Sequence, residues 1–157
     1  MDETTSSVIK KITIKYPDPQ SIYSGHKVCV YYDCLKLTPN ELVRLAADAM
    51  GDLKSEDFDL ALGIAYHGIN YANAVAGGRE VAILQADNII CGPDLKGKKV
   101  VIVDDVVHSG RKMLSAEKIA VAAGANVIGY ACIVDRSENK LTNLSKPLWS
   151  AYQTIME

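Results

Sequence analysis

Apolar residues recur along this chain in short blocks, some continuous and some at helical spacing. The clearest continuous block covers residues 100–103, four consecutive β-branched residues, and predicts a strand buried on both faces. Helical spacing follows over residues 109–123 and stops at Gly124. A buried strand followed by a helix is the repeating unit of a parallel sheet.

The rest of the chain continues this alternation after an irregular first section. The capping box Thr38-Pro39-Asn40-Glu41 begins a predicted helix that runs to about Met50. The other expected elements are a strand over 58–65, a helix over 68–76 closed by two glycines, a strand over 80–84 and a strand over 127–134. Residues 148–156 fit a strand or a helix. This order predicts an α/β fold with a mostly parallel sheet flanked by helices.

Length and charge limit the function classes. The chain has 157 residues, 17 of them basic and 19 acidic, which suits one domain and gives no electrostatic case for binding nucleic acid or a membrane surface. No apolar stretch approaches the roughly 20 residues of a membrane span, and the polar segment 1–7 leads us to expect no secretory signal. We therefore expect a cytoplasmic protein.

Cysteine and aromatic residues are few. Cys29, Cys34, Cys91 and Cys132 show no C-x-x-C spacing and lie in or beside predicted strands. We expect them to be buried, reduced thiols rather than a metal site or a disulfide set. Because the chain has one Trp and one Phe, we also expect an aliphatic core.

Two carboxylates and a small-residue loop follow the buried strand. Asp104 and Asp105 stand at its end, and the loop leads into the helix over 109–123. Unpaired N–H groups at a helix start bind phosphate, and the two acids can reach a ribose diol or a hydrated Mg²⁺. Taken alone, the acids also fit a solvated strand end. The paired acids of a response regulator are a further alternative, but those end the first strand.

The whole run over 100–112 resembles the signature of type I phosphoribosyltransferases that binds 5-phosphoribosyl 1-diphosphate (PRPP). The resemblance implies that Asp104 and Asp105 hold the ribose and, through it or through bound water, Mg²⁺. It assigns the 5′-phosphate to Val107, His108, Ser109, Gly110, Arg111 and Lys112. His108 stands where the family usually has a small residue, and Lys112 where it usually has Thr or Ser.

A second loop, Ala65-Tyr66-His67-Gly68-Ile69, also joins a predicted strand to a helix. It is similar to the loop of the orotate-specific branch that contacts the pyrophosphate of PRPP. The resemblance therefore implies pyrophosphate contacts for Tyr66, His67 and Gly68, with His67 in place of a glycine. A simple turn into a helix is the alternative.

Two further segments resemble the orotate branch. Residues 24–33 resemble its N-terminal hairpin, which implies that Lys27 lies near the base. Val134-Asp135-Arg136 resembles its Asp-Arg segment, which implies that Arg136 holds the orotate carboxylate, a natural two-point partner for a guanidinium. Ser137-Glu138-Asn139 replaces the glycines that follow in the family. Each cation alone also fits a solvated surface charge.

The segment over 85–95 departs from the branch. Orotate enzymes carry a long basic loop there, whereas this segment is short and has no basic residue before Lys96. Loss of such a preorganised charge typically costs about 100-fold in rate. Either Lys112, Arg111 or Arg79 substitutes, or the protein binds its ligand without turning it over well.

The three histidines, His26, His67 and His108, each fall in one of the three site loops. They could form an anion or metal site, or the loops could simply have diverged. A Cys-His nucleophile pair is disfavoured, because no cysteine lies in a strand-to-helix turn.

The resemblance thus implies transfer of the phosphoribosyl group of PRPP to orotate, with Mg²⁺ as cofactor and release of pyrophosphate. The alternatives are a non-catalytic or weakly active regulator that binds PRPP or a nucleotide, and transfer to a purine or another base. We expect one domain over 1–157, with an N-terminal hood mainly over 12–36, a core over about 37–136 and a tail over 137–157. We also expect a homodimer.

Overall fold

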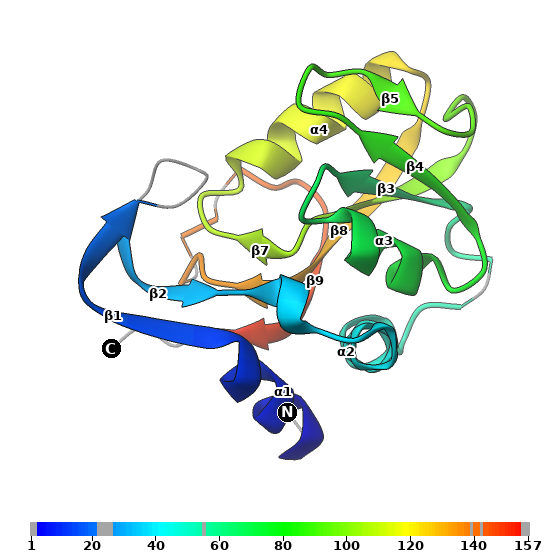
Figure 1. The fold of residues 1–157 in the computed structure, drawn as a ribbon. Helices are drawn as coiled ribbons and strands as arrows, with labels where there is room; N and C mark the ends of the chain where they lie inside the picture. The colour runs from blue at the N-terminus through cyan, green and yellow to red at the C-terminus, as the bar shows by residue number, and fades with distance from the viewer. Residues whose placement is uncertain (1–2, 22–26, 55, 139, 142, 155–157) are drawn as a thin grey trace.

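A computed structural model describes residues 3–21, 27–54, 56–138, 140–141 and 143–154 (Figure 1). Its main sheet has seven strands, in the order β5-β4-β3-β6-β8-β7, with β9 paired to β8. The strands are β3 (Leu60–Ile64), β4 (Glu80–Leu84), β5 (Ile90–Cys91), β6 (Lys99–Val103), β7 (Val106–Val107), β8 (Asn126–Asp135) and β9 (Leu148–Gln153). Of these described strands, β5 alone pairs antiparallel. The predicted α/β fold with a mostly parallel sheet is confirmed.

Helices cover both faces of this sheet (Figure 1). Side chains of α2 (Pro39–Met50) and α3 (Ile69–Ala76) share one apolar cluster with Val101 and Val103, while α4 (Arg111–Ala122) shares another with Val100 and Ile102. Alternate residues of β6 therefore face opposite layers, as a strand buried on both sides requires. Most buried residues are aliphatic, as expected, but the core also includes the fully buried rings of Tyr71 and Tyr130.

A separate two-stranded hairpin forms the hood. It pairs β1 (Thr13–Ser21) antiparallel with β2 (Lys27–Tyr32), and a short 3₁₀ helix, η1 (Cys34–Lys36), leads from it toward α2. In Figure 1 this hairpin reaches out beside the edge of the main sheet, with the N-terminal helix below it. Residues 22–26, with His26, lie outside the described residues.

That N-terminal helix, α1 (Glu3–Ile12), corrects the prediction of an irregular first section. It buries Val8, Ile9 and Ile12 in the cluster that contains α2. The sequence over 3–7 is polar and rich in Thr and Ser, which favour helix ends over interiors. The helix is therefore stabilised mainly by tertiary packing.

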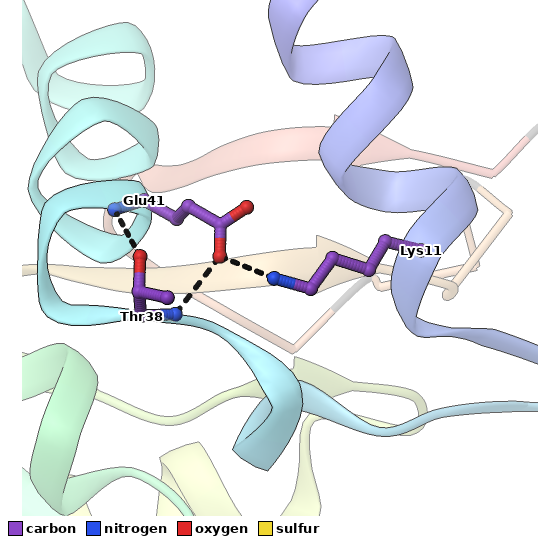
Figure 2. A network of polar contacts seen from close by, with 3 residues as sticks. All are labelled: Lys11, Thr38 and Glu41. Atoms are coloured by element: carbon purple, nitrogen blue, oxygen red, sulfur yellow. Dashed lines mark hydrogen bonds and ion pairs between the residues drawn. The ribbon is translucent and has the colours of Figure 1, made fainter.

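Figure 2 shows how α1 is tied to the start of α2. The Thr38 hydroxyl accepts from the Glu41 N–H at 3.2 Å, and Glu41 Oε1 accepts from the Thr38 N–H at 2.9 Å, so the predicted capping box is confirmed. The same Oε1 accepts from Lys11 Nζ at 2.6 Å. This bond, followed by those from Thr38, lowers the pKa of Glu41.

The cysteine prediction holds only in part. All four thiols are free and Cys132 is buried, but Cys29 and Cys91 are exposed and Cys34 is half-buried. Cys29 lies on β2 of the separate hairpin and Cys91 on the short edge strand β5 of the main sheet, which is why strand character alone misjudged their burial. Among the described residues, no helix has the length and apolar character needed to cross a membrane.

Candidate functional site

The two predicted phosphate loops lie side by side because β3 and β6 are neighbouring parallel strands. Gly63 of β3 pairs with Val103 of β6, so the loops that follow leave the same edge of the sheet. Gly68 shows how close they come: a Cβ there would lie 2.7 Å from the Val103 carbonyl and 3.0 Å from the Asp104 Cα. A glycine is therefore needed at Gly68 for the loops to meet.

The acid pair stands at this junction. Asp104 is buried, with Oδ1 accepting from the Asp105 N–H at 2.8 Å, and Asp105 Oδ1 accepts from the Val106 N–H at 2.7 Å. Burial, reinforced by the neighbouring Asp105 carboxylate, raises the pKa of Asp104 well above its ordinary value, and Lys112 opposes this shift. In the free protein, the positive charge of Lys112 therefore only partly offsets the cost of ionising Asp104.

The loop after β7 leads into the N-terminus of α4. Gly110 caps the helix at φ 78°, and Ser109 Oγ accepts from the Arg111 N–H at 3.4 Å. The positive φ of Gly110 favours glycine, and a Cβ at this position would lie 2.7 Å from the end of the Leu141 side chain. The first N–H groups of α4 are therefore presented at the loop predicted for the 5′-phosphate.

One cavity gathers most of the predicted residues. Its lining consists of Tyr31, Tyr32, His67, residues 104–113 and Arg136. Tyr66 and Gly68 are not part of that lining. Tyr66 is 56% exposed and its ring stacks on His67 with 4.4 Å between ring centroids, whereas Gly68 is buried.

A second cavity adjoins the first and contains the two predicted base contacts. Lys27 and Arg136 both line it, together with His108 and Ser109 of the phosphate loop. Arg136 is half-buried, and burial lowers its pKa. Since His108, Ser109 and Arg136 line both cavities, the residues predicted to contact the base and those predicted to contact the phosphate lie next to one another.

Two site residues were missed by the sequence analysis. Tyr31 and Tyr32 line the first cavity from β2, and the Arg136 guanidinium lies 5.4 Å from the centre of the Tyr32 ring. The pKa of Tyr31 is raised, first by burial and then by Asp105, which places its phenol near the acid pair. The available signal was their position on the same hairpin as Lys27.

The segment over 85–95 is an ordered edge hairpin. The Gln85 N–H donates to the Ile89 carbonyl at 2.9 Å, Asn88 turns the chain at φ 68°, and β5 pairs back on β4. Of the substitute cations, Arg111 and Lys112 line the first cavity. Arg79 instead donates to the carbonyls of Phe58, Ala76 and Lys54 and lies 4.0 Å over the Phe58 ring, so its place is structural.

The structure brings two of the three histidines to one cavity. His67 and His108 line the same cavity, while His26 lies outside the described residues. Within the described part of the chain, no group of three His, Cys, Asp or Glu side chains is arranged to hold a metal ion. The structure therefore places two imidazoles beside the acid pair without a ready-made histidine metal centre.

Known proteins are similar to this chain in sequence. A family model described as a phosphoribosyl transferase domain matches residues 79–148. The chain is 30% identical over 141 residues to an orotate phosphoribosyltransferase of Sulfolobus acidocaldarius, covering 81% of this chain and 72% of that protein. It is 29% identical over 134 residues to one of Sulfurisphaera tokodaii, covering 78% of this chain and 65% of that protein, just under two thirds of its length.

A solved structure extends the likeness to the whole fold. Orotate phosphoribosyltransferase of Mycobacterium tuberculosis, in complex with PRPP, superposes with a TM-score of 0.73 at 19% identity. The match covers 95% of this chain and 93% of that one, so it includes the hood as well as the main sheet.

Proposed function

The chain belongs to the type I phosphoribosyltransferase family, and we propose that it transfers the phosphoribosyl group of PRPP to orotate with release of pyrophosphate. One observation carries this proposal. The acid pair, the phosphate loop, His67 and Arg136 line a single cavity at the carboxyl edge of the sheet. Both relatives named above are orotate phosphoribosyltransferases, and the similar M. tuberculosis enzyme was solved with PRPP.

The phosphoribosyl group would be held from two sides. Asp104 and Asp105 would accept hydrogen bonds from the ribose hydroxyls. The 5′-phosphate would bind the loop from Val107 to Lys112, where helix N–H groups and two cationic side chains favour an anion. Fixing both ends of the sugar presents its C1 atom to the base, and such positioning supplies a large share of catalysis in transfer reactions.

The donor set of this site fits Mg²⁺. Carboxylate oxygens are its preferred protein ligands, and burial together with the neighbouring Asp105 raises the pKa of Asp104 although Lys112 opposes the shift, so a further cation at the pair would be favourable. We propose that Asp104 and Asp105 hold the ion through its bound waters or through the ribose. When bound, Mg²⁺ would neutralise charge on the diphosphate.

Arg136 and Lys27 would select the base. A guanidinium pairs with the orotate carboxylate through two parallel hydrogen bonds, which uracil cannot offer. Lys27 lines the same cavity and would face the pyrimidine ring. This arrangement disfavours the alternative of transfer to a purine, which lacks a carboxylate.

The departing pyrophosphate would meet His67, Arg111 and Lys112 rather than a basic flap. The tight hairpin over 85–91 favours a second candidate function, a regulator that binds PRPP or a nucleotide with little turnover. We also propose a cytoplasmic homodimer, as the family resemblance implies.

The test is direct. The purified protein is incubated with PRPP, orotate and Mg²⁺, and orotidine 5′-phosphate is measured by chromatography, with Asp105→Asn as the matched control. In parallel, PRPP with Mg²⁺ should raise the melting temperature of the wild type but not of Asp105→Asn. Product from the wild type supports the enzyme. Stabilisation without product supports the regulator. If the wild type shows neither product nor stabilisation, the proposed site is wrong.

A further inference from the structure

Glu138 stands in an unusual backbone conformation at the edge of the base cavity. Its φ is 55°, and among the described residues Asn88 is the other non-glycine with positive φ. Asn tolerates the left-handed region, but Glu rarely adopts it. Such outliers cluster at functional sites, so the position merits a functional explanation.

The position of Glu138 relative to Arg136 suggests a functional explanation. Glu138 follows Arg136 by two residues, just past the end of β8, and both line the cavity that contains Lys27. Both also line a third cavity, between α1, the hood and β9. Among the described residues that line the base cavity, Glu138 is the one acid, against Lys27, Arg136 and Lys140.

The charge of Glu138 is only weakly compensated elsewhere. Its Oε2 lies 3.8 Å from Lys140 Nζ, at the long end of an ion pair, and the Lys140 side chain is 74% exposed. Exposed pairs of this kind contribute little and are screened by solvent. The carboxylate also acts on Arg136, where it opposes the lowering of the pKa that burial causes.

We propose that Glu138 is a specificity-determining residue that competes with the substrate carboxylate for Arg136. This inference rests on the proposed function, in which Arg136 binds the carboxylate of the base. A base that carries a carboxylate must bring its negative charge beside that of Glu138, whereas a neutral base does not. Glu138 therefore weakens orotate binding selectively and narrows the preference for orotate over uracil.

The experiment compares Glu138→Gln with the wild type by calorimetric titration of orotate and of uracil. Glu138→Gln removes the charge and keeps the side-chain length. We expect its orotate Kd to fall roughly two- to five-fold, the range of a solvent-exposed charge interaction, while its uracil Kd stays unchanged. The gain should shrink between about 0.02 M and 0.5 M salt because the repulsion is screened, which a purely structural role would not produce.

Two further variants sharpen the test. Glu138→Gly removes the charge and also suits the positive φ, so it should match the affinity gain and melt no lower than the wild type. Glu80→Gln is the control, since Glu80 pairs with Lys98 at 2.5 Å on β4 and lines none of the three cavities. Its orotate Kd should equal that of the wild type.

Failure of this inference can be distinguished from failure of the proposed function. If the wild type makes orotidine 5′-phosphate but Glu138→Gln binds orotate no better, this inference is overturned and the proposed function stands. If Glu138→Gln bound uracil tighter by the same factor as orotate, the inference would also be overturned, because the effect would then come from the shape of the side chain rather than from its charge. If the wild type binds no orotate and forms no product, the proposed function fails and the inference fails with it.

Discussion

Arg136 donates a hydrogen bond from Nη1 to the backbone carbonyl of Val30 at 2.7 Å, across 106 positions of sequence. This bond joins the end of β8 in the main sheet to β2 of the hood. It uses one of the five N–H donors of the guanidinium and leaves the others for a ligand. The residue proposed to select the base is therefore also oriented by the hood.

Replacing Arg136 should affect both binding and stability. In the wild type we expect orotate to bind more than about ten-fold tighter than uracil, because a charge-assisted pair is worth roughly 1.5–3 kcal/mol. Arg136→Ala should abolish that preference. It should also lower the free energy of unfolding by about 1–3 kcal/mol, since the partly buried Val30 carbonyl loses its donor.

Calorimetry with both bases and urea unfolding measure these effects, with Arg44→Ala on the exposed face of α2 as the control. Arg136→Lys keeps the charge but not the two-point geometry, so it should recover only part of the preference. Equal affinity of the wild type for the two bases, or a preference that survives Arg136→Ala, would contradict the orotate assignment.

Local patterns predicted the strands and loops that position the site, and the structure confirms them. The run over 100–103, the acids at its end and Gly68 all carry signals that depend on a few adjacent residues: continuous burial, charge and a required small side chain. The meeting of the two loops then follows from the strand order, since neighbouring parallel strands bring their carboxyl ends together.

What the sequence did not predict depends on contacts between distant segments. Helix α1 is formed by packing against α2 rather than by its own polar sequence. Tyr31 enters the site only because the hood lies beside the end of β8, where Arg136 bonds to Val30. Arg79 leaves the list of candidate cations because it donates to the distant carbonyls of Phe58 and Lys54 as well as to the nearby carbonyl of Ala76. No local pattern encodes these approaches.

Asp104 should make the free protein less stable as pH rises. Its pKa in the folded state is raised above the ordinary carboxyl value of 3.8, so the folded state binds more protons than the unfolded state above that pH. The stability contribution of the protonated carboxyl is complete below pH 3.8 and is lost as pH rises through the raised pKa. Ionising the buried carboxyl at higher pH therefore costs free energy.

Asp104→Asn should therefore stabilise the free protein at pH 7–8 by about 1–3 kcal/mol, the usual penalty of an uncompensated buried polar group. The advantage should shrink as pH falls and vanish below pH 3.8, where the wild-type carboxyl is protonated in both states. The variant should also lose PRPP-dependent stabilisation. Urea melts from pH 4 to 8 test this, and a wild type that gains stability relative to Asp104→Asn with rising pH would refute it.

The network of Figure 2 makes a graded prediction about stability. Thr38→Ala removes the capping hydroxyl of α2 and should lower the free energy of unfolding by about 1 kcal/mol. Lys11→Ala removes a largely exposed ion pair with Glu41 and should cost at most about 0.5 kcal/mol. Lys118→Ala, exposed on α4, is the control. A larger loss for Lys11→Ala than for Thr38→Ala would show that the tie to α1 outweighs the cap.

The cations that line the cavity limit the turnover that we expect. The edge hairpin over 85–91 brings no cation to the cavity and Arg79 is held elsewhere, so under the proposed function pyrophosphate departure would depend on Lys112, Arg111, His67 and Mg²⁺. We expect turnover below the ordinary range of about 1–1000 per second. Lys112 lines the cavity and acts electrostatically on Asp104, which makes it the strongest substitute for the missing basic loop.

Lys112→Ala should therefore cut the residual rate of orotidine 5′-phosphate formation sharply, by about 100-fold if Lys112 supplies the transition-state charge. Lys112→Thr, the residue usual in the family, should tighten binding of the 5′-phosphate without raising the rate, because a hydroxyl is a good phosphate donor but carries no charge. Lys118→Ala, on the same helix and outside the cavity lining, should leave the rate unchanged. A wild type that turns over at an ordinary rate and is indifferent to Lys112→Ala would show that this cavity stabilises the leaving group without a lysine. In that case the neighbouring Arg111 would be the cation to test next, since it lies on the same first turn of α4.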